Sequence, residues 1–365
     1  MKISIIGTHG IPGKYGGFET FAEEFSLLLV KYGHDVLVQC DNSLLKPDVY
    51  RGVRLFYSSS TKSNNPFKYY FEGLKLALNE SDIVLVAGTG GAMFYFMKFF
   101  RKKTIITNTD GLESERLKWP LPHRIFLKIS ERLAVWFSDF VIADSDAIKK
   151  HLSESCRVAR YKIRTIEYGA PVVNSFDENV LLKHKLRYEQ YFLVVCRLEP
   201  ENNVCMIIDG FLASETGKIL IIVGNLTENK YVTKLVGGNK SNRIRFLGSI
   251  YDKSELNSLR YACKAYIHGH SVGGTNPSLL EAMGCGNIII CHDNVFNREV
   301  TANSQFYFKN AADFKNRIAE VESMSPGQVT IMKESGVKRI RDYYNWEIIY
   351  KKYESLFIET YDKFK

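Results

Sequence analysis

The sequence has 365 residues, 45% hydrophobic and 24% charged, which is the composition of a soluble globular protein, and its length predicts about two domains. The net charge of +9 is not accompanied by a helix-turn-helix, zinc-finger or RNA-recognition signature, so we expect no nucleic-acid partner. Seven cysteines without a C-x-x-C pair predict buried thiols in a reducing cytoplasm, and no run approaches the roughly 18 apolar residues of a membrane span.

Short apolar runs alternate with helix-like stretches through the first half of the chain. The first run, at 2–7, has the pattern of a strand and lacks the apolar region and cleavage site of a signal peptide. Continuous Val/Ile runs bounded by glycine indicate strands buried on both faces of a parallel sheet. The predicted strands are 2–7, 35–40, 53–57, 82–88, 103–107, 140–144 and 163–169, and helices are predicted over 18–31 and 66–78.

The second half repeats this alternation after a polar, proline-containing join at 169–180. Its predicted strands are 191–196, 218–224, 244–248, 265–269 and 287–291. Strands that alternate with helices predict a doubly wound α/β unit. We therefore expect two Rossmann-like domains that face a cleft, at 1–172 and 173–341, and an amphipathic helix within 342–365 that crosses back to the first domain.

A glycine-rich loop, GTHGIPGKYGG, follows the first strand, and Gly16 and Gly17 directly precede the predicted helix. Backbone N–H groups at a helix start can bind phosphate when no Cβ obstructs them; without a ligand the pair is a tight turn. The spacing matches neither G-x-G-x-x-G nor the Walker pattern. Asp41 lies roughly where a dinucleotide dehydrogenase places its ribose-binding acid, so that alternative stays open.

Arg197 directly follows the first strand of the second half, in the segment VVCRLEPENN. Ligands bind at the carboxyl ends of the strands in such sheets. A guanidinium there suits a diphosphate, because it is always charged and forms paired hydrogen bonds. The alternative is a surface ion pair with Glu199 or Glu201.

The segment HGHSVGGTNPSLLEAM, 268–283, joins a predicted buried strand to a predicted helix. Gly273–Asn276 would expose amides at the helix start, and Pro277 suits its first turn. Glu281 lies one turn further along, where a carboxylate is favourable and its oxygens can accept from two sugar hydroxyls. Amides for phosphate and a carboxylate for ribose together predict a nucleotide-sugar site.

Four segments now establish a resemblance that spans nearly the whole chain: IGTHGIPGKYGGFET, TDGLESERLKW, CRLEPENN and HGHSVGGTNPSLLEAM. They resemble the retaining glycosyltransferases of family 4, which have the GT-B fold. More narrowly they are similar to the bacterial β-1,4-rhamnosyltransferases of surface-polysaccharide synthesis, such as that of O-antigen or capsule.

This resemblance implies the activity. The family uses a nucleoside-diphosphate sugar held mainly by the C-terminal domain, binds the acceptor on the N-terminal domain and needs no bound metal. Its rhamnosyltransferases move rhamnose from dTDP-rhamnose to a saccharide on a lipid-diphosphate carrier. We therefore expect a hexosyltransferase in the cytoplasm, peripheral at the inner face of the cell membrane.

The resemblance also implies site residues, carried over by position. Arg197 would clamp the donor diphosphate, Glu281 would hold the ribose hydroxyls, and Asp110 would lie on the acceptor side; these are the predicted catalytic residues. The predicted donor-binding residues are Gly16, Gly17, Arg197, Asn202, His270, Gly274, Thr275, Asn276 and Glu281.

Two positions depart from the broader family. Gly273 stands where a glutamate is usual, eight residues before Glu281, and Asn202 stands where a lysine is usual. Both departures resemble the rhamnosyltransferase branch. A 6-deoxy sugar presents fewer hydroxyls, which agrees with the loss of a carboxylate, so we interpret the changes as tuning for the donor.

Retention without an evident nucleophile implies attack from the face that the nucleotide leaves. The leaving phosphate would take the acceptor proton, and the enzyme would supply positioning and charge stabilisation. Asp110 would orient the acceptor hydroxyl, or act as general base if the reaction inverted; its structural alternative is to cap the segment after its strand. His9, His268 and His270 have either donor or acceptor contacts or hydrogen-bonded structural roles.

Two further patterns have competing interpretations. Asp144–Asp146 resembles a metal-binding D-x-D, but it precedes a helical run and is more simply a helix cap. The region 98–128 mixes an excess of Lys and Arg with Phe and Trp. This stripe predicts contact with an anionic membrane surface, and its alternative is a solvated helix face.

Four functions remain open from the sequence. The first is the transferase, with dTDP-rhamnose or with another donor such as UDP-glucose, UDP-galactose or GDP-mannose. The second is a sugar-nucleotide epimerase of the same architecture, which needs no acceptor. The third is an inactive nucleotide-sugar-binding subunit, which Gly273 and Asn202 would suit. A dehydrogenase ranks last.

Overall fold

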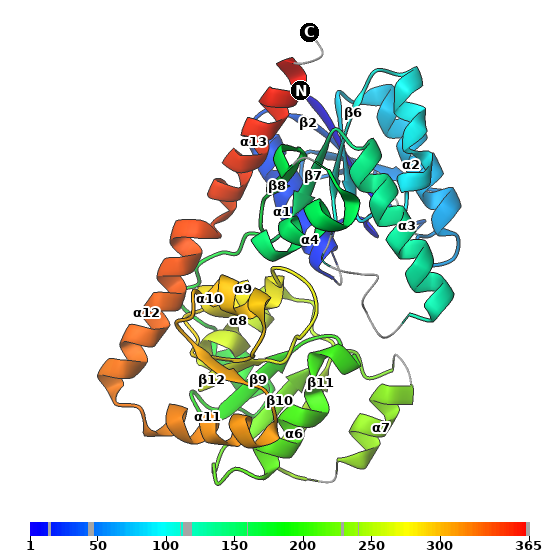
Figure 1. Cartoon of the computed structure of the whole chain (residues 1–365). Coiled ribbons are helices and arrows are strands. Elements are labelled where there is room, and N and C mark those ends of the chain that lie inside the picture. Colours follow the sequence, from blue (N-terminus) through cyan, green and yellow to red (C-terminus); the bar gives the residue numbers. More distant parts are fainter. Residues whose placement is uncertain are drawn as a thin grey trace. The chain divides into compact units, whose positions relative to one another are not determined.

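The structure is a computed structural model that describes residues 1–13, 16–42, 47–109, 111, 119–158, 160–227, 230–239 and 241–362. Its chain forms two compact units (Figure 1). The first consists of Met1–Tyr168 together with helix α13 (Trp346–Asp362), and the second is Gly169–Asn345. The chain changes unit after Tyr168 and Asn345, whereas the sequence predicted boundaries after 172 and 341.

The first unit is built on an eight-stranded sheet with the order β3-β4-β2-β1-β5-β6-β7-β8. Every neighbouring pair is parallel except β3 and β4. The central strands β5, β6 and β7 are buried along their whole length, as their continuous apolar runs predicted. The strands are β1 (Lys2–Ile6), β2 (Asp35–Cys40), β3 (Val49–Tyr50), β4 (Val53–Tyr57), β5 (Ile83–Ala87), β6 (Thr104–Asn108), β7 (Phe140–Ala143) and β8 (Ile163–Thr165).

Helices cover both faces of this sheet (Figure 1). One core cluster joins Tyr70 of α2, Tyr95 of η1 and Ala134 of α3 to the strands. On the opposite side, Phe25 of α1 packs against Tyr353 of α13, with ring centroids 4.5 Å apart. The bounds are α1 (Gly17–Lys31), α2 (Pro66–Glu80), the 3-10 helix η1 (Ala92–Phe100), α3 (Leu121–Phe137), α4 (Asp146–Cys156) and the 3-10 turn η3 (Arg160–Lys162).

Helix α13 belongs to the first unit although it follows the second in sequence. Arg164 of β8 donates to Glu359 at 2.9 Å, and Lys352 pairs with Glu167 at 2.5 Å. The predicted crossover helix from 342 is interrupted, because α12 ends at Tyr343 and α13 starts at Trp346. The amphipathic pattern from 342 onward therefore covers the last residues of α12 and then α13, and it is not one continuous helix.

The second unit has a six-stranded, all-parallel sheet with the order β11-β10-β9-β12-β13-β14. Its interior is aliphatic and aromatic: Phe192 and Val194 of β9 pack with Phe211 of α6 and Phe314 of α11. These observations confirm the predicted α/β class. The strands are β9 (Tyr191–Val195), β10 (Ile219–Val223), β11 (Ile244–Gly248), β12 (Ala265–His268), β13 (Ile289–His292) and β14 (Phe306–Phe308).

The helices of the second unit lie on both faces of its sheet (Figure 1). Helix α11 packs on α6, and α12 packs on α9. None of the helices within the described ranges is long and apolar enough to cross a membrane. The bounds are α5 (Glu178–Lys183), the 3-10 turn η4 (Pro200–Asn202), α6 (Val204–Leu212), α7 (Lys230–Gly238), α8 (Lys253–Ala262), α9 (Pro277–Gly284), α10 (Val295–Thr301), α11 (Ala311–Ser323) and α12 (Pro326–Tyr343).

The packing of α13 gives a stability prediction with a built-in control. Phe357 is 0% exposed, whereas its neighbour Ile358 is 51% exposed. We expect Phe357→Ala to lower the free energy of unfolding of the first unit by about 3–5 kcal/mol, because it leaves a cavity, and Ile358→Ala to change it by less than about 1 kcal/mol. Urea denaturation of both variants measures this. Equal effects would show that α13 is not part of the core.

Candidate functional site

The second sheet reverses its winding between β9 and β12, and the candidate site lies at the carboxyl ends of these two strands. The chain runs from β9 outward to β10 and β11, then returns to β12 on the other side of β9. Loops diverge at such a point and leave room for a ligand. Arg197 follows β9, and the loop 269–276 follows β12, so the fold brings these two sequence motifs together.

The loop after β9 is braced by Asn202. Its side-chain amide donates to the carbonyl of Arg197 at 2.8 Å, and its oxygen lies 3.0 Å from Nδ1 of His270. Asn203 donates to the carbonyl of Gly269 at 2.8 Å. Asn202 is only 6% exposed. It therefore joins the loops after β9 and β12, a role that the sequence, which assigned it to donor binding, did not predict.

Helix α9 starts at the edge of the sheet as its sequence predicted. Asn276 is the N-cap, and its side chain accepts from the backbone N–H of Ser278 at 3.0 Å; Pro277 occupies the first turn. Gly273 has φ +108°, a conformation that L side chains rarely adopt. A glutamate at this position would be strained in the observed backbone conformation.

A hydroxyl pair fixes α9 to the end of β9. The hydroxyl oxygens of Tyr266 and Ser278 lie 2.6 Å apart, and both lie within hydrogen-bonding distance of the Val195 carbonyl, at 3.0 and 3.1 Å. Val195 is the last residue of β9. The position of α9 relative to the Arg197 loop is therefore set by direct contacts.

Glu281 of α9 is held by a buried arginine that the sequence analysis missed. Arg260 of α8 lies 2.5 Å from Oε2 of Glu281, and the two side chains are 3% and 23% exposed. Burial opposes the charge of Arg260, but Glu281, together with Tyr266 and Cys285, raises the pKa of the guanidinium overall. Glu281 is thus anchored while its side chain remains partly exposed. No motif marks Arg260, since it lies in an ordinary amphipathic helix.

Arg197 is a partly exposed cation at the same edge. Its guanidinium is 3.9 Å from Oε1 of Glu199, the ion pair named above as its structural alternative. The side chain of Arg197 is 36% exposed, so this contact is a loose one that a phosphate could replace.

Buried polar atoms without a protein partner gather at this edge, as judged over the described residues. They are both carboxylate oxygens of Glu201, Nε2 of His268 and Nδ1 of His292. Glu201 follows β9, His268 ends β12 and His292 ends β13. Because buried polar groups are normally hydrogen-bonded, unpaired groups on three neighbouring strands indicate a place for a polar ligand or ordered water.

The remaining residues of the loop after β12 are not equally accessible. Thr275 is 4% exposed and His270 is 9% exposed, whereas Gly274 and Asn276 are intermediate. The backbone carbonyl of His270 accepts from the side chains of Asn294 and Asn297 at 2.9 and 3.0 Å. The predicted donor residues Asn202 and His270 therefore lie in two loops that hydrogen bonds hold together, and Gly274–Asn276 continue the second of these loops.

The glycine loop of the first unit is filled by the protein's own carboxylates. Glu19 accepts from the backbone N–H of His9 at 3.0 Å, and Glu23 accepts from that of Gly13 at 3.1 Å. A Cβ on Gly16, at φ +113°, would lie 2.2 Å from Oε2 of Glu19. An anion already lies at the start of α1, which argues against the predicted phosphate cradle at Gly16 and Gly17.

Asp41 is also engaged. Its Oδ2 lies 2.6 Å from Nδ1 of His9, and its Oδ1 accepts from the backbone N–H of Lys62 at 2.8 Å. Each oxygen thus has a protein partner, which gives Asp41 a role within the first unit that does not involve a dinucleotide.

Asp110, the predicted acceptor-side residue, lies outside the described residues, so its role stays a prediction.

The D-S-D segment at 144–146 has a structural role. Ser145 of the D-S-D segment accepts from the backbone N–H of Ile148 at 3.3 Å and caps α4, which confirms the interpretation as a helix cap. Over the part of the chain that the structure describes, no cluster of three or more His, Cys, Asp or Glu could hold a metal ion.

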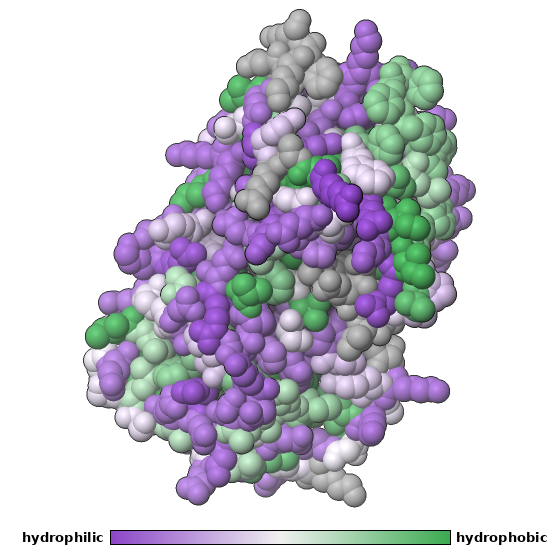
Figure 2. Space-filling model, in the orientation of Figure 1, coloured by the Kyte–Doolittle hydropathy of each residue, from purple (hydrophilic) through white to green (hydrophobic). Residues whose placement is uncertain are grey.

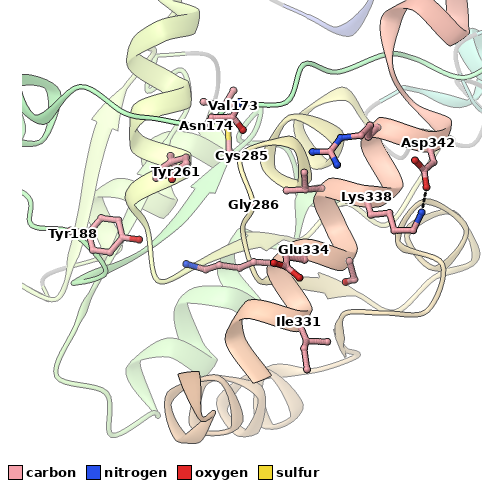
Figure 3. A pocket seen from close by; sticks show the side chains of 14 residues that line it. Val173, Asn174, Tyr188, Tyr261, Cys285, Gly286, Ile331, Glu334, Lys338 and Asp342 are labelled. Atoms are coloured by element: carbon pink, nitrogen blue, oxygen red, sulfur yellow. Dashed lines mark hydrogen bonds and ion pairs between the residues drawn. The ribbon is translucent and has the colours of Figure 1, made fainter. Parts of the chain in front are cut away.

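A separate groove of about 780 Å³ lies in the second unit where α12 passes the C-terminal end of α9 (Figure 3). Its lining includes Tyr188, Tyr261, Cys285 and Lys338, the last of which is paired with Asp342. The predicted donor residues are not among those that line it. The groove is thus distinct from the edge that carries Arg197 and Glu281.

Comparisons with known proteins agree with this architecture. Residues 182–339 match the family profile described as glycosyl transferases group 1, and residues 76–171 match a domain of unknown function, DUF1972. An uncharacterised glycosyltransferase of Methanocaldococcus jannaschii is 25% identical over 284 residues, covering 72% of this chain and 70% of that protein.

Solved structures show the same fold over the whole chain. Sucrose-phosphate synthase of Thermosynechococcus elongatus has a TM-score of 0.83 at 15% identity, with 99% of each chain covered. Anabaena HepE in complex with UDP-glucose has a TM-score of 0.80 at 15% identity, covering 98% of this chain and 100% of that one. These are GT-B glycosyltransferases, so the predicted GT-B fold is confirmed.

The buried histidine at this edge predicts a pH dependence of stability. Burial, assisted by His292, lowers the pKa of His268 from 6.5 to about 3. The unfolded chain therefore binds a proton that the folded chain does not, and stability is lost as pH falls from about 6.5 towards 3. We expect a slope of up to about 1.4 kcal/mol per pH unit in that window.

Urea denaturation at several pH values within this window, for the parent and for His268→Leu, measures the slope. The variant should have the shallower slope. His292, whose pKa burial also lowers, contributes with the same sign and remains in both proteins. An unchanged slope in the variant would contradict the assignment.

Proposed function

We propose that this chain, a group 1 glycosyltransferase with the GT-B fold, moves a sugar with retention from a nucleoside-diphosphate donor to a lipid-diphosphate-linked saccharide in bacterial surface-polysaccharide synthesis. The observation that carries the proposal is the carboxyl edge of the second sheet. It presents the partly exposed Arg197, the anchored Glu281 and buried polar atoms without protein partners.

In this proposal the second unit binds the donor. Arg197 contacts the diphosphate, and the outward part of the Glu281 carboxylate accepts from ribose hydroxyls. The amides at Gly274–Asn276 and the N-terminus of α9 add positive potential near the phosphates. His270 lies beside this loop, and Asn202 acts by holding the loop in place.

The chemical step follows from this arrangement. The bond from the anomeric carbon to the diphosphate oxygen breaks, and the acceptor oxygen bonds to that carbon on the same face. The acceptor proton passes to the departing phosphate oxygen. Arg197 and the loop amides stabilise the charge that develops on the diphosphate. We assign orientation of the acceptor hydroxyl to Asp110.

We propose dTDP-rhamnose as the donor. The support is Gly273, which has no carboxylate where the broader family has one and whose φ of +108° would strain a glutamate. A 6-deoxy sugar has one hydroxyl fewer to bind, so it needs one hydrogen-bond acceptor fewer. UDP-glucose is the second candidate, because the structurally similar HepE binds it.

Donor binding is tested by transfer assays with Arg197→Ala and Glu281→Gln. The second variant keeps the side-chain shape but removes the charge that compensates Arg260, so its melting temperature is measured beside its activity. We expect each to lower the transfer rate about a hundredfold, as for loss of one transition-state contact. The controls Arg187→Ala and Glu215→Ala alter exposed side chains away from this edge and should be neutral.

The assay offers dTDP-rhamnose, UDP-glucose, UDP-galactose and GDP-mannose separately, with a lipid-diphosphate-linked glucose or N-acetylglucosamine as acceptor. Transfer from dTDP-rhamnose alone supports the proposal. Transfer from a different donor would keep the mechanism and overturn the rhamnose assignment. Nucleotide binding without transfer from any donor to either acceptor would favour an inactive binding subunit.

Exposed apolar side chains on the first unit support the proposed lipid-linked acceptor. Helix α3 carries four exposed apolar side chains. These are Leu121, Ile125, Ile129 and Trp136, which are 68%, 53%, 53% and 52% exposed. Its buried residues include the polar Ser130 and Glu131. A helix with its apolar face in solvent lacks a partner.

The 3-10 helix η1 adds Phe96, Phe99 and Phe100, which are 52%, 62% and 80% exposed. Figure 2 shows hydrophobic side chains gathered where α2 and α3 lie in Figure 1. Exposed cations, including Lys128 and Arg132, lie along α3. Apolar groups beside cations suit an anionic lipid surface.

Vesicle sedimentation tests this surface. We expect binding to phosphatidylglycerol vesicles that weakens, without disappearing, as salt is raised, because only the charge contribution is screened. The double variant Ile125→Ser/Ile129→Ser should lower binding at least about tenfold. The control Ile331→Ser alters a residue that is 70% exposed in the second unit. Equal binding to neutral vesicles at every salt concentration would contradict the proposal.

A further inference from the structure

His9 and Asp41 form a hydrogen-bonded pair at the carboxyl edge of the first sheet. Strands β1 and β2 are parallel neighbours, and the two residues follow the ends of these strands at Ile6 and Cys40. Their main chains are joined as well, because the N–H of Asp41 donates to the carbonyl of His9 at 3.0 Å. The edge where this fold class binds ligands thus carries a histidine and a carboxylate in contact.

The hydrogen bonds around Asp41 determine which nitrogen of His9 carries the proton. Oδ2 of Asp41 lies 2.6 Å from Nδ1 of His9, and Oδ1 accepts from the backbone N–H of Lys62 at 2.8 Å. A carboxylate only accepts, so Nδ1 of the imidazole must donate. The neutral ring therefore has its lone pair at Nε2, and the His9 side chain is 45% exposed.

The loop that carries His9 is fixed on both sides. The backbone N–H of His9 donates to Glu19 of α1 at 3.0 Å. Lys62 donates from its Nζ to the carbonyl of Gly7 at 2.6 Å, and Tyr69 of α2 donates to the carbonyl of Thr8 at 2.5 Å. The imidazole is thus presented from a rigid support, which is what precise orientation of a bound hydroxyl requires.

We propose that Nε2 of His9 accepts a hydrogen bond from a hydroxyl of the acceptor saccharide, and that Asp41 is the positioning residue that orients the ring and selects the neutral tautomer with its lone pair at Nε2. The inference rests on the proposed function, which places the acceptor on the first unit. A carbohydrate hydroxyl fits the site because it donates one hydrogen bond to an exposed, oriented acceptor. His9 takes no proton from the nucleophile, which passes its proton to the departing phosphate.

Asp41→Asn separates this role from simple packing. The amide has the shape of the carboxylate, but one of its two ends is an N–H donor. If that end faces Nδ1, the ring must hold its proton at Nε2 and loses its acceptor. If it faces the Lys62 N–H, two donors meet and the loop shifts. Either way the acceptor site is impaired while the fold is kept.

The experiment measures steady-state kinetics with donor and acceptor varied in turn, for the parent, His9→Ala, His9→Gln and Asp41→Asn. We expect His9→Ala and Asp41→Asn to lower kcat/KM for the acceptor about tenfold, the equivalent of one hydrogen bond. The KM for the donor should stay within about twofold. His9→Gln retains an acceptor oxygen and should recover most of the loss.

His9→Gln gives a second readout, because it keeps Asp41, Glu19 and Lys62 in place and changes only the ring that would accept from the saccharide. The control His151→Ala alters another histidine beside a carboxylate, on α4.

The outcomes separate this inference from the proposed function. If the parent transfers sugar and His9→Ala keeps its kcat/KM for the acceptor, the role of His9 is wrong and the function stands. An equal loss for donor and acceptor, with a lowered melting temperature, would indicate a structural role and also overturn the inference. If the parent transfers nothing from any donor yet binds nucleotide, the proposed function itself fails.

Discussion

The buried charge of Arg260 is the constraint on which the candidate donor site depends. Removing the partner of such a group leaves an uncompensated charge in the interior, which typically costs about 3–5 kcal/mol. Glu281 must therefore stay beside Arg260, and this fixes α9 against α8. Tyr266 and Ser278 then connect α9 to the last carbonyl of β9, two residues before Arg197. A buried ion pair thus helps to set the positions of the residues at the candidate donor site.

Polar groups are paired differently at the carboxyl edges of the two sheets. In the first unit, Glu19, Glu23 and Asp41 occupy the backbone N–H groups of the loops. In the second unit, Glu201, His268 and His292 leave buried polar atoms unpaired within the described chain. Both edges carry carboxylates, but only the second has the partly exposed Arg197 beside unpaired buried groups that a polar ligand could satisfy. This difference agrees with the proposed donor on the second unit.

The first unit combines two features that suit a lipid-linked substrate. Helix α3 buries Ala134 and Val135 but also exposes Leu121, Ile125 and Ile129, so apolar side chains occur on its outer face as well as its inner one. The same unit carries the imidazole of His9 on a rigid loop. The exposed apolar surface and the proposed saccharide contact at His9 thus belong to one compact body, which agrees with the proposed lipid-linked acceptor.

The sequence alone determined the α/β class, the parallel sheets and the strand ends that carry Arg197 and the loop before Glu281, because continuous Val/Ile runs and glycine-bounded turns are local signals. Only the tertiary structure decided how the polar groups pair. Nothing local distinguishes Arg260 from any helical arginine or shows that Asn202 braces two loops. Nor does sequence reveal that Glu19 occupies the space at Gly16, or that Asp41 faces His9. Each of these contacts joins residues on different elements, and their pairing depends on which strands become neighbours when the sheets assemble.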